Sequence, residues 1–221
     1  MTFLNHIAII LESNKSLYNL LYNTYRFNFI ITRWSMIIYV EESGFQRNWT
    51  FVAVKIPSEE IARSSVKKWR RYAASVSRKF RANEYKDCKA PDLQRKKILQ
   101  VISGKGLQFW VVHFINYGGH KKEYSEAILK LLKEVDLTDV SLIVLDKVER
   151  SRRYMDKHIE KIREGLLCTC MIRCGLSERE KGIQIADAIC GAASRNFNNM
   201  VAPSFFNLIE HLKQGVKVIV K

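Results

Sequence analysis

Three acidic residues stand at the end of, or inside, apolar segments that are expected to form a folded core. Glu41 follows the apolar run 36–40, Asp146 follows the run 140–145, and Asp187 lies within the apolar segment 183–189. Adjacent strands of a parallel sheet end at one edge, where ligands bind, and a helix over that edge would bring the third carboxylate to the other two. Converging carboxylates repel one another unless a divalent cation neutralises them. With bound Mg²⁺ or Mn²⁺, such a cluster is suited to phosphodiester hydrolysis.

Each carboxylate also has a purely structural interpretation. A single acid at a strand end is often a turn former or a helix cap. Asp187 is harder to explain in that way, because a charge beside Ile183, Ala186 and Ile189 costs stability unless it is paired or bound to a metal. The residues alone leave both interpretations of Asp187 open.

The elements that would position these acids follow from hydrophobic periodicity. Strands are expected at 36–40, 48–56, 107–115, 140–145 and 168–174, with Gly44 supplying the turn between the first two. Helices are expected at 57–80, 91–103, 123–135, 151–165 and 182–197. Two adjacent strands followed by strands that alternate with helices predict an α/β fold. Its sheet should be mixed, antiparallel at the start and parallel in the remainder.

Positive charge is concentrated in one part of the chain. The 221 residues carry 37 Lys and Arg against 22 Asp and Glu, a formal net charge of +15, and the segment 63–105 alone holds fourteen basic residues and three acidic ones. Such a run is often a solvated helix face. Because the excess has one sign and falls in two consecutive helices, we expect it to bind the phosphate backbone of DNA or RNA. The residues expected to do so are Lys67, Lys68, Arg70, Arg71, Arg78, Lys79, Arg95, Lys96 and Lys97.

Composition excludes several other classes of protein. Hydrophobic residues make up 47% and charged residues 27%, and the 10 Gly and 3 Pro exclude collagen and low-complexity disorder. No run approaches the roughly 18 apolar residues of a membrane span, and no signal peptide is recognisable. Together with an odd number of cysteines, five, this predicts a cytoplasmic, intracellular protein with no membrane partner.

Other reactive side chains fit a structural role better. Cys168, Cys170 and Cys174 share one parity, but they lack the paired spacing of a zinc site and are expected to be buried strand residues. His113 and Trp69 are expected in the core. The chain has no P-loop, no dinucleotide-binding fingerprint and no nucleophile elbow.

Four motifs resemble those of the domain-of-unknown-function family 3800, in the family's order. YVEESG at 39–44 resembles its first strand and DESG motif, NEYK at 83–86 its ExK element, LIVLD at 142–146 its central strand, and GIQIADAICG at 182–191 its LQxADxxxG helix. The family has Asp where this chain has Glu41. That substitution keeps the charge and lengthens the side chain by one methylene.

The resemblance implies a ribonuclease H-like fold whose carboxylates bind Mg²⁺ or Mn²⁺. It assigns the three main carboxylates to Glu41, Asp146 and Asp187. Glu42 and Glu84 would be further acidic members, and Lys86 and Gln184 would be polar supports.

These observations predict a metal-dependent nuclease. Its ribonuclease H-like domain would span residues 36–201, with a basic helical insertion at 57–105 after the second strand. Residues 1–35 would form an N-terminal extension, and 202–221 a C-terminal helix and tail. One alternative is a nucleic-acid-binding protein of the same fold that has lost catalysis through the change at Glu41. Another is a structural protein whose charge serves solubility. Oligomeric state is left open.

Overall fold

The computed structural model describes residues 35–76, 86–87, 90–117, 123–146, 152–166 and 168–198. A compact unit begins at Met36. The extension predicted at 1–35, apart from Ser35, and the C-terminal segment predicted at 202–221 lie outside the described residues. The predicted domain boundaries therefore stay predictions.

The described strands form one mixed sheet. They are β1 (Met36–Phe45), β2 (Asn48–Ile56), β3 (Gln108–Phe114), β4 (Val140–Asp146) and β5 (Met171–Gly175), in the spatial order β3-β2-β1-β4-β5. The pairs β1–β2 and β2–β3 are antiparallel, whereas β1–β4 and β4–β5 are parallel. This confirms the predicted mixed sheet, with β1 at its centre.

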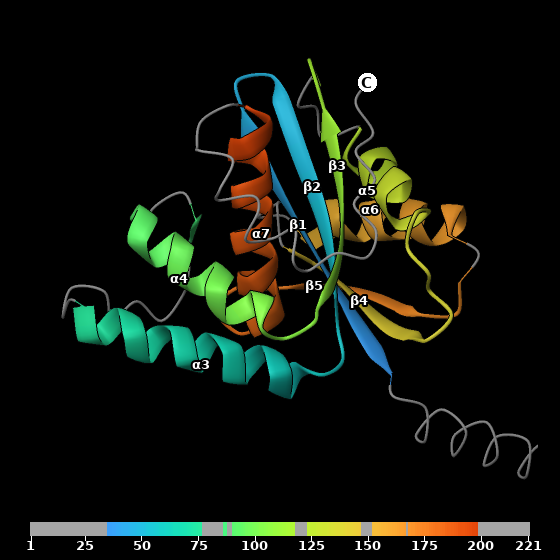
Figure 1. Cartoon of the computed structure of the whole chain (residues 1–221). Coiled ribbons are helices and arrows are strands. Elements are labelled where there is room, and N and C mark those ends of the chain that lie inside the picture. Colours follow the sequence, from blue (N-terminus) through green and yellow to red (C-terminus); the bar gives the residue numbers. More distant parts are fainter. Residues whose placement is uncertain are drawn as a thin grey trace, which may run out of the picture. The chain divides into compact units, whose positions relative to one another are not determined.

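Helices cover both faces of this sheet (Figure 1). On one face lie α3 (Glu59–Val76), α4 (Asp92–Ser103) and α7 (Lys181–Phe197), and on the other lie α5 (Tyr124–Leu132) and α6 (Arg152–Gly165). Two helices do follow β2, as predicted. Because α3 and α4 pack into the same core as α7, they form a wall of the described domain. Their status as a basic insertion stays a prediction.

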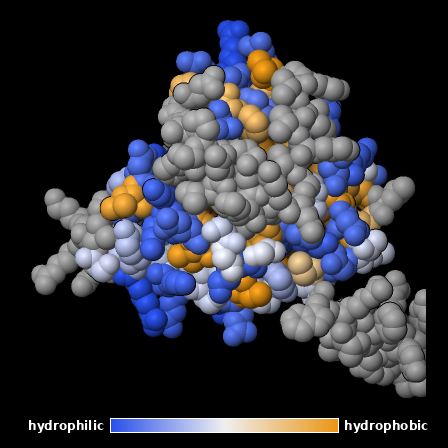
Figure 2. Space-filling model, viewed as in Figure 1, coloured by the Kyte–Doolittle hydropathy of each residue, from blue (hydrophilic) through white to orange (hydrophobic). Residues whose placement is uncertain are grey.

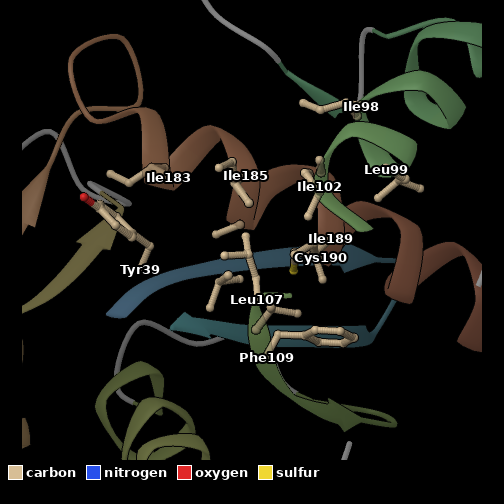
Figure 3. Close-up of a cluster of buried hydrophobic side chains, with 14 of the residues drawn as sticks. Tyr39, Ile98, Leu99, Ile102, Leu107, Phe109, Ile183, Ile185, Ile189 and Cys190 are labelled. Atoms are coloured by element: carbon tan, nitrogen blue, oxygen red, sulfur yellow. The ribbon is translucent and has the colours of Figure 1, made fainter. Parts of the chain in front are cut away.

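Strand alternation divides the core into two layers. Successive residues of a strand point to opposite faces, so Tyr39 joins the α3/α4/α7 layer and Val40 the α5/α6 layer. Ile183, Ile185 and Ile189 of α7 face the sheet in the first layer (Figure 3) and are fully buried. Each such side chain contributes roughly 1.5–3 kcal/mol through burial. This packing fixes the position of α7 over β1 and β2.

The first strand is longer than predicted. β1 continues through Glu41 to Phe45, which pairs with Asn48, so the carboxylate lies inside the strand rather than at its end. Beyond the apolar run, antiparallel pairing with β2 supplies the hydrogen bonds that extend the strand. The polar residue types of 41–45 do not reveal that pairing.

The prediction that Gly44 supplies the turn is wrong. Gly44 pairs with Trp49 inside the ladder, and the turn comes two residues later, where Gln46 adopts a φ of 56°. A Cβ at Gly44 would lie 2.8 Å from the Trp49 indole. Glycine at this position therefore allows the Trp49 ring of β2 to pack directly against the backbone of β1.

Candidate functional site

Two predicted carboxylates lie on neighbouring strands and face the same helix layer. Val40 of β1 pairs with Leu145 of β4, so the residues that follow each of them, Glu41 and Asp146, are next in register. Alternation places both on the side of Tyr39 and Val144, which belong to the α3/α4/α7 layer. Parallel pairing thus carries the two acids to one edge of the sheet.

The third carboxylate comes from α7. Cys190 lies over the sheet, and its thiol donates to the carbonyl oxygens of Glu41 at 3.6 Å and of Thr50 at 3.3 Å. Asp187 lies about one turn earlier on the helix and is half-buried. It accepts a hydrogen bond of 3.0 Å from the main-chain N–H of Asp87, 100 positions away in the sequence.

The charges of these acids affect one another. Burial is the main cause that raises the pKa of Glu41 well above its ordinary value. The nearby charges of Glu42, Asp146 and Asp187 raise this pKa further. The structure thus brings Glu41, Glu42, Asp146 and Asp187 into one electrostatic cluster, which we call the acidic site.

Two further carboxyl groups of the acidic site have shifted pKa values. Burial, followed by the charge of Asp146, raises the pKa of Glu42 to about 8. Burial also raises the pKa of Asp187 to about 7, while the N–H of Asp87 opposes that rise. The ammonium of Lys86 lowers the pKa values of Glu41, Glu42 and Asp187 alike. Lys86 therefore lies within reach of three carboxylates as a counter-charge.

The donor set of the acidic site is suited to a hard divalent cation. Oε2 of Glu41 and Oε2 of Glu42 are buried and accept no hydrogen bond from any residue the structure describes. Buried carboxylate oxygens normally have partners, and oxygen donors are what Mg²⁺ and Mn²⁺ bind. Within the described ranges, however, no three His, Cys, Asp or Glu side chains already have an arrangement that would hold a metal ion. The chemistry of the site fits the cation, and the carboxylates would have to turn toward a common point to bind it.

Other predicted site residues lie elsewhere. Gln184 is fully buried, and its amide donates to the carbonyl of Ser177 at 2.5 Å, so it links α7 to the loop after β5. Glu84, Arg78 and Lys79 lie outside the described residues.

Asp87 is not among the site residues that the sequence predicts. It is only 3% exposed and pairs with Arg195 of α7 and Arg95 of α4. Its partners Asp187 and Arg195, with Gly191 between them, fall on one face of α7 at intervals of four residues, but this spacing does not indicate which residue binds there.

The predicted nucleic-acid-binding residues of α3 and α4 are only partly accessible. Lys67, Lys68, Arg71 and Lys96 are exposed, and Arg70 and Lys97 are half-buried. The ammonium of Lys97 lies 4.8 Å from the centre of the Tyr72 ring, and the Arg95 side chain is 17% exposed because it is engaged with acids. Figure 2 shows hydrophilic side chains along the lower left edge of the view, over α3.

The structural interpretations of Trp69 and His113 are confirmed. Trp69 is 2% exposed, and His113 is 3% exposed with its ring 2.9 Å from the hydroxyl of Thr50. The cysteine prediction was wrong in part, since β5 begins at Met171 and only Cys174 of the three lies on it. The cysteines at 168, 170 and 174 are half-buried thiols.

A cavity of about 760 Å³ lies between α6 and β5, and none of the four acidic-site residues lines it. Three arginines and three acids surround it, so that its charge is balanced: Arg163, Arg173, Arg179, Asp156, Glu160 and Glu180. No helix among the described residues is long and apolar enough to cross a bilayer.

Comparison with known proteins supports the fold. No protein-family model matches the chain, and no curated protein matches it significantly in sequence. The resemblance to family 3800 therefore stays a prediction. Among solved structures, the chain is similar to the ribonuclease H2 of Pyrococcus horikoshii OT3, with a TM-score of 0.53 and 12% identity over 75% of each chain. Together with the mixed five-stranded sheet and its flanking helices, this similarity is consistent with a ribonuclease H-like α/β fold.

Proposed function

We propose that this protein is a divalent-cation-dependent nuclease that hydrolyses phosphodiester bonds in DNA or RNA. The observation that carries the proposal is the acidic site, in which carboxylates from β1, β4 and α7 affect one another although they are far apart in the sequence. Burying several acids together is costly unless a cation compensates them. Clusters of buried acids with raised pKa values are typical of functional sites.

The roles of the residues follow from their positions. Glu41, Asp146 and Asp187 would hold Mg²⁺ or Mn²⁺, with Glu42 as a further ligand. The bound cation would supply an activated water and charge neutralisation at the phosphate. Lys86 would balance charge while the acids are ionised, because its ammonium favours their ionised forms. The exposed cations of α3 and α4 would hold the backbone of the nucleic acid.

Cleavage assays with labelled single- and double-stranded DNA and RNA test this proposal. We expect Asp146→Asn to reduce cleavage by more than the roughly 10- to 100-fold loss that follows removal of residues supporting a metal site. Asp156→Asn, on the exposed side of α6, is the matched control and should cleave like the wild type. Equal activity of wild type and Asp146→Asn at saturating Mn²⁺ would refute the proposal.

The second candidate is a protein of the same fold that binds nucleic acid without cutting it. It is favoured by the finding that, within the described ranges, no three potential ligands have a metal-holding arrangement. Under this alternative, salt-dependent binding would occur without cation-dependent cleavage, and Asp187→Asn would leave the salt dependence unchanged. Cleavage that appears only in Glu41→Asp would identify the longer side chain as the cause of lost catalysis.

A further inference from the structure

One face of α7 carries three residues in line: Asp187, Gly191 and Arg195. Residues four positions apart on a helix lie one above the other, so these three form a stripe slightly more than two turns long. Asp87 lies along this stripe and contacts it at three levels.

Each level of the stripe has its own contact. The main-chain N–H of Asp87 donates to Oδ2 of Asp187 at 3.0 Å. Oδ1 of Asp87 accepts from Nη2 of Arg195 at 2.9 Å, and Oδ2 accepts from Nη1 of the same guanidinium. Between them, a Cβ at Gly191 would overlap the Asp87 carboxylate. The glycine is therefore what lets Asp87 reach both charged residues at once.

A second arginine, Arg95 of α4, also binds Asp87. Nε and Nη2 of Arg95 donate to the main-chain carbonyl of Asp87 at 3.1 and 2.8 Å, and Nε lies 3.7 Å from its carboxylate. Two guanidinium groups thus pair with the buried carboxylate of Asp87, although its charge still raises the pKa of Asp187. Such paired, bidentate contacts are strong and directional.

We infer that Asp87 is a positioning residue, which docks on the α7 stripe and thereby holds Lys86 and the carboxylate of Asp187 in place at the acidic site. Asp87, Arg95 and Arg195 together are called the Asp87 latch. The inference deepens the proposed function and rests on it, since Asp187 is one of the proposed cation ligands. Lys86 directly precedes Asp87 in the chain. The Asp87 latch therefore also fixes the position of the Lys86 ammonium relative to the acidic site.

Gly191→Ala tests the latch without changing any charge. The added methyl group would push Asp87 away from the stripe, although Ala favours a helix by about 1 kcal/mol over Gly. Gly104→Ala is the matched control, because a Cβ there meets nothing within 4 Å. We expect Gly191→Ala to weaken Mn²⁺ binding at least about 10-fold in calorimetric titration, the range for residues that support a metal site. The control should bind like the wild type.

A second readout works without metal. Hydrogen exchange of the Asp87 amide, followed by NMR, reports its bond to Asp187. Exchange should accelerate at least 10-fold in Gly191→Ala and Arg195→Gln, and Arg195→Lys should restore part of the protection. Far-UV circular dichroism checks that each variant is folded. Arg173→Gln removes another ion pair, that with Glu180, and should change neither readout.

The outcomes separate the inference from the proposed function. If the wild type binds Mn²⁺ and both Gly191→Ala and Arg195→Gln bind it equally well, the latch does not position the site. If the wild type neither binds Mn²⁺ nor cleaves nucleic acid, the proposed function fails, and amide exchange alone decides the latch. Unchanged hydrogen exchange of the Asp87 amide in both Gly191→Ala and Arg195→Gln would then overturn the inference that Asp87 docks on the α7 stripe.

Discussion

The main chain of α7 at Gly182 packs directly on the ring of Tyr39 in β1, and a Cβ at this position would overlap the ring. The side chain of Tyr39 is also tied to α3, since its hydroxyl donates to Glu59. Because Gly182 has no side chain, the backbone at the start of α7 can lie against the Tyr39 ring, and this contact sets the distance between α7 and the central strand β1. Asp187 lies five residues further along this helix, so the same contact sets the distance between the carboxylates of the two elements.

Gly182→Ala should destabilise the protein despite the better helix propensity of Ala. The methyl group would have to displace a fully buried tyrosine ring, and overpacking of this kind costs about 1–3 kcal/mol. Urea unfolding should show a lower midpoint with an unchanged slope. Gly104→Ala, whose Cβ enters open space, should unfold like the wild type. Equal midpoints for both variants would show that the helix does not depend on this contact.

Asp187→Asn should stabilise the metal-free protein at high pH. The pKa of Asp187 is raised to about 7, against about 3.9 in an unfolded chain, so the folded state holds the extra proton between these values. The stability that this proton provides is present below pH 4 and is lost as the pH rises through 7. Asn avoids that loss, and its amide oxygen can still accept from the Asp87 N–H.

The advantage of Asp187→Asn should therefore be near zero below about pH 4, grow between pH 4 and 7, and reach the order of 1–2 kcal/mol at pH 8. This is below the full value of the pKa shift because the Asp187 carboxylate is only partly buried, so that solvent screens its charge. Thermal melts in chelator at several pH values would measure it. The charged groups around Asp187 are Asp87, Lys86, Asp146, Glu41 and Glu42, none of which is replaced in the variant. A variant less stable than the wild type at pH 8 would contradict this electrostatic account.

Cation binding should release protons. Glu42 and Asp187, with pKa values near 8 and 7, are partly protonated at neutral pH and must ionise to bind a metal. Affinity for Mn²⁺ should thus rise with pH between about 6 and 8. Calorimetry in buffers of different ionisation enthalpy counts the protons, and Glu42→Gln should release fewer. A pH-independent affinity would mean that these two groups do not bind the cation.

Exposed cations on α3 and α4 should set the salt dependence of nucleic-acid binding. Replacing Lys67, Lys68, Arg71 and Lys96 by Gln should lower the slope of log K against log salt by up to about 0.9 per lost phosphate contact on duplex DNA. The matched control replaces Lys130 of α5, Lys133 directly after it, and Arg153 and Lys157 of α6, since these two helices cover the other face of the sheet. An equal loss in both variants would indicate nonspecific attraction by net charge.

The sequence predicted the strand and helix order well, because each buried element carries a clear hydrophobic period. The acids at the ends of such elements could be named for the same reason. Asp87 could not be named, since the surrounding segment 81–90 has no apolar period and its partner Arg195 is 108 positions away. Likewise, the true length of β1 depends on pairing with β2 and on the Gly44–Trp49 contact. Contacts between distant segments decide these features.

The proposed function depends on binding of a divalent cation at the acidic site through Asp187. Titrating Mn²⁺ into wild type and Asp187→Asn at pH 8, with melting temperature as the readout, tests it most directly. A ligand of the folded state alone adds about 2.7 kcal/mol at 100 times its dissociation constant. That corresponds to roughly 5–11 °C for a chain of this size. We expect this rise in the wild type and its loss in Asp187→Asn; equal shifts in both, or no shift in the wild type, would show that Asp187 does not bind a cation.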